Sequence, residues 1–247
     1  MISPVFVQDT PALLLGKILI IGDIHIGVER EYRDSGLYIP SQTGKILENV
    51  KNLVEKTRAK KIIILGDVKH NIPGTSSQEE RDIPVFLEKL SEHAELEVIP
   101  GNHDGDLKRI LPEKIKLHPS KGIGLDDIYL IHGHTWPEKE FLKAKILIMA
   151  HIHPHIEFKD KLGYRWTEPV WIKTVLDKEK IAKKFGEVKK LPRIIIIPAF
   201  NRLVGGMCVN KETEEKDFVS PVFRCCDKKR SELYLLDGTY LGMLKNL

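Results

Sequence analysis

Five short segments of the chain end in side chains that commonly bind metal ions. Each begins as an apolar run of strand length and then becomes polar. These segments carry eight of the ten histidines. The polar endings are Asp23-Ile24-His25, Gly66-Asp67-Val68-Lys69-His70, Gly101-Asn102-His103-Asp104, His132-Gly133-His134 and His151-Ile152-His153-Pro154-His155. One such ending is weak evidence, since Asp-x-His and Gly-Asp also occur in ordinary turns, but five in succession favour a shared metal centre.

The residue types indicate which ions such a centre would hold. Carboxylates, an amide oxygen and imidazoles form a mixed oxygen and nitrogen donor set, which suits Mn²⁺, Zn²⁺ or Fe rather than Ca²⁺ or a thiolate-bound metal. Asp23 and His25 are two residues apart, as are His151 and His153. In an extended segment both members of such a pair would point to the same side. The nearby glycines allow sharp turns that bring backbone close to an ion or phosphate.

The elements expected around the first endings would bring them together. Helical periodicity predicts helices at 41–58 and 79–93, with Ser41 or Thr43 as the first N-cap and Pro84 early in the second, where proline is tolerated. Apolar runs predict strands at 17–22, 61–66, 96–100, 128–132, 145–150 and 193–198. Strand–helix–strand order predicts parallel pairing, with a site beyond the carboxyl ends of the strands.

The second half of the chain predicts a further mixed sheet packed on the first. Strands are expected at 171–175 and 203–209, and Asp237-Gly238 predicts a hairpin between flanking strands. Residues 176–190 predict a charged, helical insertion. Because no repeat or linker interrupts the sequence, residues 1–247 are expected to form a single α/β domain.

Composition narrows the classes of function. The net charge of +4 is compatible with an anionic substrate but lacks the strong basic bias of proteins that bind duplex DNA. Neither a membrane-length apolar run nor a signal peptide is evident, which predicts a cytoplasmic protein without membrane contact. Three cysteines, two of them adjacent, predict free thiols. Abundant Lys and Glu with scarce Gln is typical of thermophile proteins.

The polar endings, in this order, resemble the motifs of the calcineurin-like metallophosphoesterases. That family's pattern is Asp-x-His, Gly-Asp, Gly-Asn-His-Asp/Glu, His and Gly-His-x-His, and only Ala150 departs from it, in place of a glycine. Within this family, the sequence most resembles the DNA-ligase-associated phosphoesterases of bacteria and their archaeal relatives. The residues that carry this resemblance are 36–40, 198–200 and 205–206. The resemblance implies a four-layer αββα sandwich of two mixed sheets flanked by helices.

The same resemblance implies two divalent metal ions, with Mn²⁺ ahead of Zn²⁺, Fe or Ni²⁺. Asp67 would bridge the two ions, because neighbouring cations need shared negative charge. The implied ligands are Asp23, His25, Asp67 and His153 for one ion, and Asp67, Asn102, His132 and His151 for the other. His103 would steady the phosphate and protonate the leaving oxygen. His70 stands where protein phosphatases of the superfamily have Asp and its repair nucleases often have His.

Other residues are expected around these ligands. Asp104 and His134 would orient the imidazoles that hold metal. His155 would either do the same or be an exposed residue without a role at the site, and the sequence favours neither. Candidates for substrate contact are Arg30, Arg33, Asn201 and Arg202. An arginine can grip phosphate through two hydrogen bonds, although surface arginines are common.

The expected function is hydrolysis of phosphodiesters in nucleotides or nucleic-acid ends, including 2′,3′-cyclic phosphates, by hydroxide that the metal ions generate. One alternative is a DNA or RNA nuclease in a repair complex, with a ligase or helicase as partner, and a basic groove or added domains would favour it. Other phosphoesterases, such as nucleotide pyrophosphatases, are a second alternative. A catalytically silent binding scaffold is a third, but such proteins lose metal-binding histidines and this sequence keeps every motif position.

Overall fold

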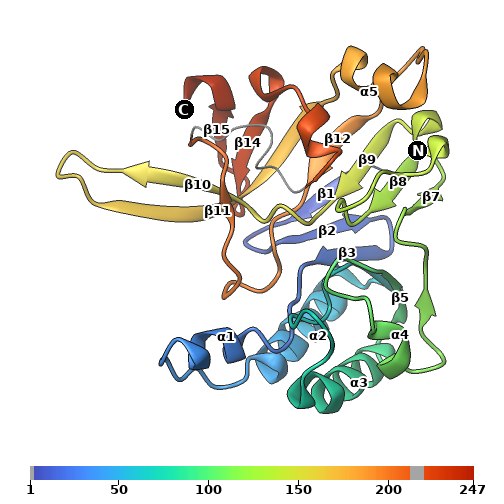
Figure 1. Cartoon of the computed structure of the whole chain (residues 1–247), viewed down its shortest axis with the longest axis vertical. Coiled ribbons are helices and arrows are strands. Elements are labelled where there is room, and N and C mark those ends of the chain that lie inside the picture. Colours follow the sequence, from blue (N-terminus) through green and yellow to red (C-terminus); the bar gives the residue numbers. More distant parts are fainter. Residues whose placement is uncertain (1–2, 212–219) are drawn as a thin grey trace.

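Two mixed β-sheets form the centre of the protein, and helices cover their outer faces (Figure 1). The computed structural model describes residues 3–211 and 220–247. The first sheet has the order β1-β2-β3-β4-β5-β6. Its strands are β1 (Pro4–Val7), β2 (Ala12–Leu15), β3 (Ile18–Gly22), β4 (Lys61–Leu65), β5 (Glu95–Ile99) and β6 (Lys116–Leu117). The strands β3, β4 and β5 pair in parallel, which confirms the predicted order of strand and helix.

The second sheet follows the order β13-β10-β11-β12-β9-β8-β7, and β14 pairs with both β11 and β15. Its strands are β7 (Ile123–Leu125), β8 (Ile128–Ile131), β9 (Ile146–Met149), β10 (Pro154–Lys159), β11 (Arg165–Val175), β12 (Arg193–Ile196), β13 (Met207–Cys208), β14 (Glu232–Leu235) and β15 (Tyr240–Met243). The hairpin predicted around Asp237-Gly238 is present as β14 and β15. The strand predicted at 203–209 is wrong except for the short β13, because Leu203 donates its N–H to the Asn201 side chain in a loop.

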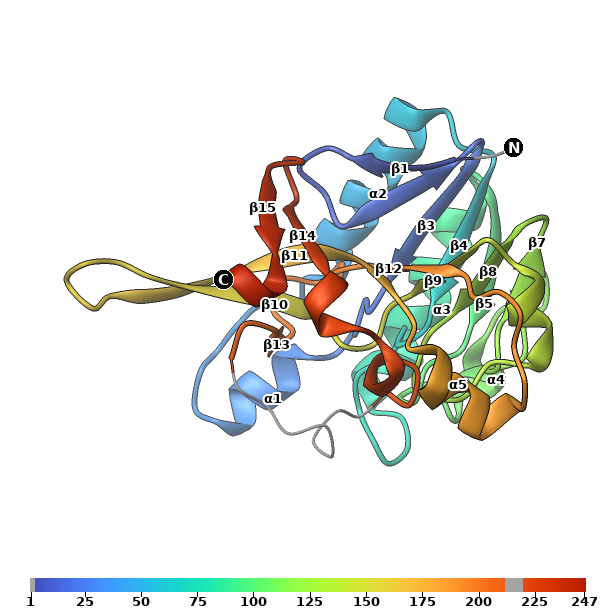
Figure 2. The ribbon, with the colours of Figure 1, turned by 90° about the horizontal axis from the view of Figure 1, so that it is seen from above.

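Helices lie on the outer face of each sheet, as Figure 2 shows from a second direction. They are α1 (Glu29–Asp34), α2 (Thr43–Thr57), α3 (Ser77–Ser91), α4 (Leu107–Ile110) and α5 (Lys178–Phe185), with 3-10 turns η1 (Lys139–Lys143), η3 (Phe223–Cys225), η4 (Lys228–Arg230) and η5 (Leu244–Asn246). The predicted insertion at 176–190 contains α5, whose N-cap is Asp177.

Apolar side chains point alternately to the two faces of each sheet, which explains why both faces are covered. In β4, Ile62 belongs to the apolar cluster that includes α2 and α3, whereas its neighbour Ile63 belongs to the cluster between the sheets. In β9, Ile148 belongs to that same central cluster, whereas Leu147 joins the cluster that includes α5. Successive side chains of a strand point to opposite faces, so strands apolar on both faces need cover on both. The three apolar clusters make the fold a four-layer αββα sandwich.

The ends of two helices differ from expectation. Neither Ser41 nor Thr43 caps α2: its N-cap is Gln42, which makes no side-chain capping bond. Its backbone N–H donates instead to the Glu29 carboxylate, 2.6 Å away. The helix α3 starts two residues before the predicted 79–93, because Ser76 and Glu79 form a capping box. Pro84 therefore lies inside α3 and not in its first turn.

The hairpin of β10 and β11 extends from the body of the protein (Figures 1 and 2). The sequence prediction covered only 171–175, because the outer part of the hairpin is exposed and has no buried face to impose alternation. The three cysteines are free thiols, as predicted. Within the described residues, no helix combines the length and the apolar character needed to span a bilayer.

Candidate metal centre

The loops after β3, β4, β5, β8 and β9 converge at the carboxyl ends of these strands. The loop after β3 runs beside the loop after β4, because the N–H groups of Asp23 and His25 donate to the carbonyls of Gly66 and Asp67. The N–H of His151 donates to Asp23 Oδ2 across 3.1 Å, which joins the two sheets at this point. Polar endings that are distant in sequence therefore share one location.

A first group of potential ligands gathers Asp23, His25, Asp67 and His153. One ligand atom of each lies within 4.8 Å of those of the others. Asp23 Oδ1 is 3.3 Å from His153 Nε2, and His25 Nε2 is 3.5 Å from Asp67 Oδ2. These are the residues that the sequence assigned to one ion.

A second group gathers Asp67, His132 and His151 within the same 4.8 Å limit. His132 Nε2 is 3.3 Å from Asp67 Oδ2 and 3.1 Å from His151 Nδ1. The amide oxygen of Asn102 is 3.3 Å from the same His132 nitrogen. Asp67 is the carboxylate common to both groups, in the position that the sequence predicted for a bridge.

The backbone at this centre is unusual. Among the described residues, eight that are not glycine have positive φ, and five of these are predicted ligands: Asp23, His25, Asp67, His151 and His153. The prediction that each pair lies in an extended segment is therefore wrong, because these residues have left-handed backbone. Asp23 and His25 still meet in one group, but His151 and His153 separate into different groups. Each left-handed residue costs roughly 1–2 kcal/mol.

Hydrogen bonds fix the orientation of two imidazoles. His132 Nδ1 donates to the Leu65 carbonyl at 2.8 Å, and His153 Nδ1 donates to the Gly205 carbonyl at 2.9 Å. In the neutral ring each Nε2 is then an acceptor, and each faces a carboxylate. This arrangement of a carbonyl behind the ring and an acceptor nitrogen in front is typical of metal-binding histidines.

Charges in the centre depend strongly on one another. Burial alone would raise the pKa of Asp67, but His132 and His25 hold it well below its usual value. Burial alone would lower the pKa of His132, but Asp67 and Asp23 raise it to about 9. Burial, together with the adjacent His132, lowers the pKa of His151 to about 3. Asp67 is thus an ionised carboxylate that requires positive charge beside it.

The donor set fits two divalent cations. Asp23 Oδ1 is buried without a hydrogen-bond partner among the described residues. The acceptor nitrogens of His25 and His153 lie 3.4 Å apart, with no hydrogen donor between them when both rings are neutral. Lone pairs that face one another and a buried carboxylate are unfavourable unless a cation lies among them. Mixed oxygen and nitrogen ligands suit Mn²⁺, Zn²⁺ or Fe.

His103 and His70 lie on one side of these groups. The backbone N–H of His103 donates to Asp67 Oδ1 at 2.9 Å, and its Nδ1 donates to the His70 carbonyl. His70 Nδ1 approaches His25 Nδ1 at 3.3 Å, while its Nε2 is 3.1 Å from Glu31 Oε2. Burial is the main cause that lowers the pKa of His70. His25, His70 and His103 form a third compact group of imidazoles.

Sequence reasoning missed the two carboxylates that support this side. Glu31 is the partner of His70, and nothing in its surroundings on α1 indicated it. Glu79 accepts hydrogen bonds from the backbone N–H groups of His70 and Asn71, at 2.8 and 2.6 Å. Glu79 was detectable, because Ser76-x-x-Glu79 is the pattern of a capping box.

The three expected orienting residues have different surroundings. Asp104 is buried and accepts from the N–H groups of Val68, Lys69 and Gly101, so it holds two loops together. Burial, followed by the charge of Asp67, raises the pKa of Asp104 to about 6. The His134 ring lies 5.2 Å from that of His132, and its buried Nδ1 has no partner among the described residues. His155 Nδ1 donates to the His153 carbonyl at 2.9 Å.

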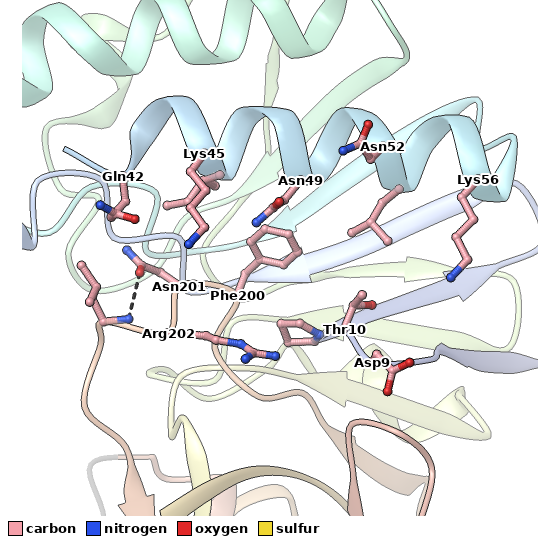
Figure 3. A pocket seen from close by; sticks show the side chains of 14 residues that line it. Asp9, Thr10, Gln42, Lys45, Asn49, Asn52, Lys56, Phe200, Asn201 and Arg202 are labelled. Atoms are coloured by element: carbon pink, nitrogen blue, oxygen red, sulfur yellow. Dashed lines mark hydrogen bonds between the residues drawn. The ribbon is translucent and has the colours of Figure 1, made fainter. Parts of the chain in front are cut away.

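The candidate substrate residues are dispersed. Asn201 is buried, and its amide nitrogen donates to the Ile24 carbonyl at 2.9 Å, so the side chain supports the loop after β3. Arg30 lies 3.8 Å from Asp34 on α1, and Arg33 is exposed on the same helix. Arg202 is exposed and lines a cavity beside α2 (Figure 3).

Comparison with known proteins places the chain in a family through one family model and finds solved structures that are similar to it. The model of the family described as calcineurin-like phosphoesterase matches residues 16–188. The nuclease MPE of Pseudomonas putida is similar over 96% of this chain and 98% of its own, with 20% sequence identity and a TM-score of 0.54. Yfce, a phosphoesterase from E. coli, matches 58% of this chain and 73% of its own, with 18% identity and a TM-score of 0.36. None of the curated proteins matches the chain.

Proposed function

We propose a substrate for this chain from the premise that it belongs to the calcineurin-like phosphoesterase family and is a metal-dependent phosphoesterase. The proposed reaction is hydrolysis of phosphodiesters in nucleotides or nucleic-acid ends, including 2′,3′-cyclic phosphates. The observation that carries the proposal is the pair of ligand groups that share Asp67, with His103 and His70 beside them. His70 stands where protein phosphatases of the superfamily have Asp and its repair nucleases often have His, which favours a diester as the substrate.

The residues around the ligand groups have separate tasks in this proposal. Two divalent cations, Mn²⁺ in our proposal, would acidify a water molecule and neutralise the phosphoryl oxygens. Asp67 spans both positions, and the N–H of His103 keeps its carboxylate in place. His70 lies between His25 and Glu31 and holds the His25 ring in orientation.

His103 is the proposed acid for the leaving oxygen. Its Nδ1 hydrogen is bonded to the His70 carbonyl, which fixes the orientation of the ring. Protonated His103 then presents its Nε2 hydrogen on the other side of the ring. Transfer of this proton to the leaving oxygen would avoid an unfavourable alkoxide and contributes about 10²–10⁴-fold in typical enzymes.

A metal-dependence screen tests the proposal. Purified protein is assayed with bis-p-nitrophenyl phosphate, p-nitrophenyl phosphate, 2′,3′-cyclic nucleotides and single-stranded DNA, with Mn²⁺, Ni²⁺ or Mg²⁺ or with a chelator. We expect diester cleavage with Mn²⁺ and none with chelator. Activity on the monoester alone would contradict the proposed diester specificity, although it would leave the family assignment intact.

One observation favours the nuclease as a second candidate. At the projecting hairpin, the Phe158 and Trp166 rings stack with centroids 5.3 Å apart, and Tyr164 stacks on Trp166 at 6.1 Å. Lys159 and Lys161 are exposed beside them. Aromatic faces next to cations bind single-stranded nucleic acid by base stacking. In the same screen, cleavage of single-stranded DNA more efficient than that of the cyclic nucleotides would favour the nuclease.

The cellular setting remains part of the proposal. The three free thiols suit a reducing compartment, which supports a cytoplasmic protein. The abundance of Lys and Glu, with only three Gln, supports a thermophilic source.

A further inference from the structure

A second polar site lies beside α2, away from the predicted metal ligands. It is a cavity of about 510 Å³ between α2, the turn that joins β1 to β2, and the loop after β12. This volume lies within the range of about 300–1,000 Å³ that is usual for small-molecule sites. None of the seven predicted metal ligands is among its lining residues. The cavity is therefore separate from the metal centre.

Helical spacing places four polar side chains of α2 along this cavity. Lys45, Asn49, Asn52 and Lys56 recur at intervals of three or four residues and all line it. The apolar side chains of α2 that lie between them pack into the core of the first layer. In Figure 3, Lys45, Asn49 and Lys56 point from the helix into the cavity. The polar stripe of α2 thus faces a concave surface.

The cavity has an excess of positive charge. Arg202 lies across from α2, and Asp9 is the carboxylate at the end near Lys56 (Figure 3). The side chains of Lys45, Lys56 and Arg202 make no hydrogen bond or ion pair with any other residue that the structure describes. Three cations face one carboxylate in this cavity, which favours an anionic ligand. Cations without protein partners retain their full capacity to bind phosphate.

The remaining lining residues favour an organic ligand that carries a phosphate over a simple inorganic anion. Asn49 and Asn52 offer both donors and acceptors, which suit the edge of a base or the hydroxyls of a sugar. Phe200 and Leu53 provide an apolar floor. We propose that this cavity binds a nucleoside phosphate, with the phosphate held by Arg202 and one of the two lysines at the ends of the cavity, Lys45 or Lys56.

This site shares a wall with the metal centre. The Phe200 N–H donates to the Gly22 carbonyl at 3.0 Å, and the Asn201 N–H donates to the Asp23 carbonyl at 3.3 Å. Phe200 and Asn201, which line the cavity, therefore lie directly against the segment that carries Asp23 into the metal centre. The nucleoside phosphate bound here is distinct from a substrate at the metal centre, so the proposal goes beyond the proposed function.

Calorimetric titration tests the site without any assay of activity. Full-length protein with Mn²⁺ is titrated with AMP, adenosine, inorganic phosphate and a 5′-phosphorylated single-stranded oligonucleotide. The double variant Lys45→Gln/Lys56→Gln is compared with Lys51→Gln/Lys89→Gln, two helix lysines that do not line the cavity. Asp67→Asn serves as a third protein, in which phosphate binding at the metal centre is impaired.

We expect AMP to bind the wild type, the Lys51/Lys89 control and Asp67→Asn. In Lys45→Gln/Lys56→Gln we expect roughly tenfold weaker binding or more, since charge-assisted hydrogen bonds to phosphate are lost. Adenosine should bind much more weakly than AMP. If AMP binds more tightly than the oligonucleotide, the ligand is a free nucleotide. If the oligonucleotide binds more tightly than AMP, the ligand is a nucleic-acid end.

Three results would overturn the proposal. The first is AMP binding that Asp67→Asn abolishes and Lys45→Gln/Lys56→Gln leaves intact, since AMP would then lie at the metal centre. The second is equal affinity for AMP and adenosine, because the phosphate would not be recognised. The third is binding of none of the probes. Both lysines are exposed, so the double variant should fold, and a thermal melt checks this.

Discussion

The metal centre and the cavity beside α2 are bordered by two segments that are hydrogen-bonded to each other, and the two sites are built in opposite ways. At the metal centre, Asp23 and Asp67 are 0% and 2% exposed, and both have left-handed backbone. In the cavity, the three cations are exposed: Lys45 and Lys56 lie on the helix α2, and Arg202 lies in a turn. The first site is preorganised at a cost to folding, whereas the exposed side chains of the second would lose conformational freedom only on binding a ligand.

This difference teaches where each site is vulnerable. A buried carboxylate with a left-handed backbone depends on its neighbours, so changes at the metal centre should reduce both stability and catalysis. An exposed lysine contributes little to folding, so changes in the cavity should reduce ligand binding alone. Substitutions that separate catalysis, metal binding and stability can break or sharpen this contrast.

The largest effect is expected for Asp67→Asn. The amide weakens the ligand shared by both groups, so metal content should fall and diesterase kcat should drop by about 10³-fold or more, because metal ions supply several kcal/mol of transition-state stabilisation. Kinetics and elemental analysis measure the two quantities. Asp106→Asn, an exposed carboxylate that makes no capping bond, is the matched control. Full activity in Asp67→Asn would remove the proposed bridge.

His103→Ala should separate catalysis from metal binding. The bond that holds Asp67 comes from the backbone N–H of residue 103, which alanine retains. Metal content should therefore stay unchanged, while kcat falls by about 10²-fold because the proton donor is lost. The slower reaction should persist at saturating Mn²⁺. If metal is lost in this variant, the His103 ring is itself a ligand.

Gly101→Ala tests how tightly the centre is packed. A Cβ at this position would collide with the Asp67 carboxylate, whereas one at Gly105 meets nothing within 4 Å. We expect Gly101→Ala to lower the free energy of unfolding by about 1–3 kcal/mol, the usual cost of overpacking, and to release metal. Urea unfolding in Mn²⁺ measures the first effect, with Gly105→Ala as the control. Equal stability of the two variants would show that the loop adapts.

The sequence predicted much of the metal centre, for a definite physical reason. Buried parallel strands read as continuous apolar runs, and the carboxyl ends of such strands meet at one edge. The polar residues after Gly22, Gly66 and Met149 were therefore expected together, and the structure brings them together. The stated geometry was wrong, because φ is positive at Asp23 and His151, and no local pattern distinguishes a left-handed aspartate from an extended one.

Other features were not predictable from local sequence. The spacing of Lys45 and Lys56 was visible, but a polar stripe on a helix usually faces solvent. The opposite wall comes from Phe200 and Arg202, which follow a strand of the other sheet, so only the fold reveals the cavity. The position of Pro84 was misjudged because tertiary packing and the Ser76 cap, not helix propensity, set where α3 begins.

The smallest effect is expected from Lys45→Gln/Lys56→Gln on stability. Neither lysine has a partner within the part of the chain that the structure describes, so neutralising both should change the free energy of unfolding by less than about 0.5 kcal/mol. The relief of repulsion with Arg202 even favours the variant slightly. Urea unfolding of this variant and of Gly101→Ala compares the free energy of unfolding lost at the cavity with that lost at the metal centre. A loss as large as that of Gly101→Ala would mean that the cavity, like the metal centre, is built into the folded state.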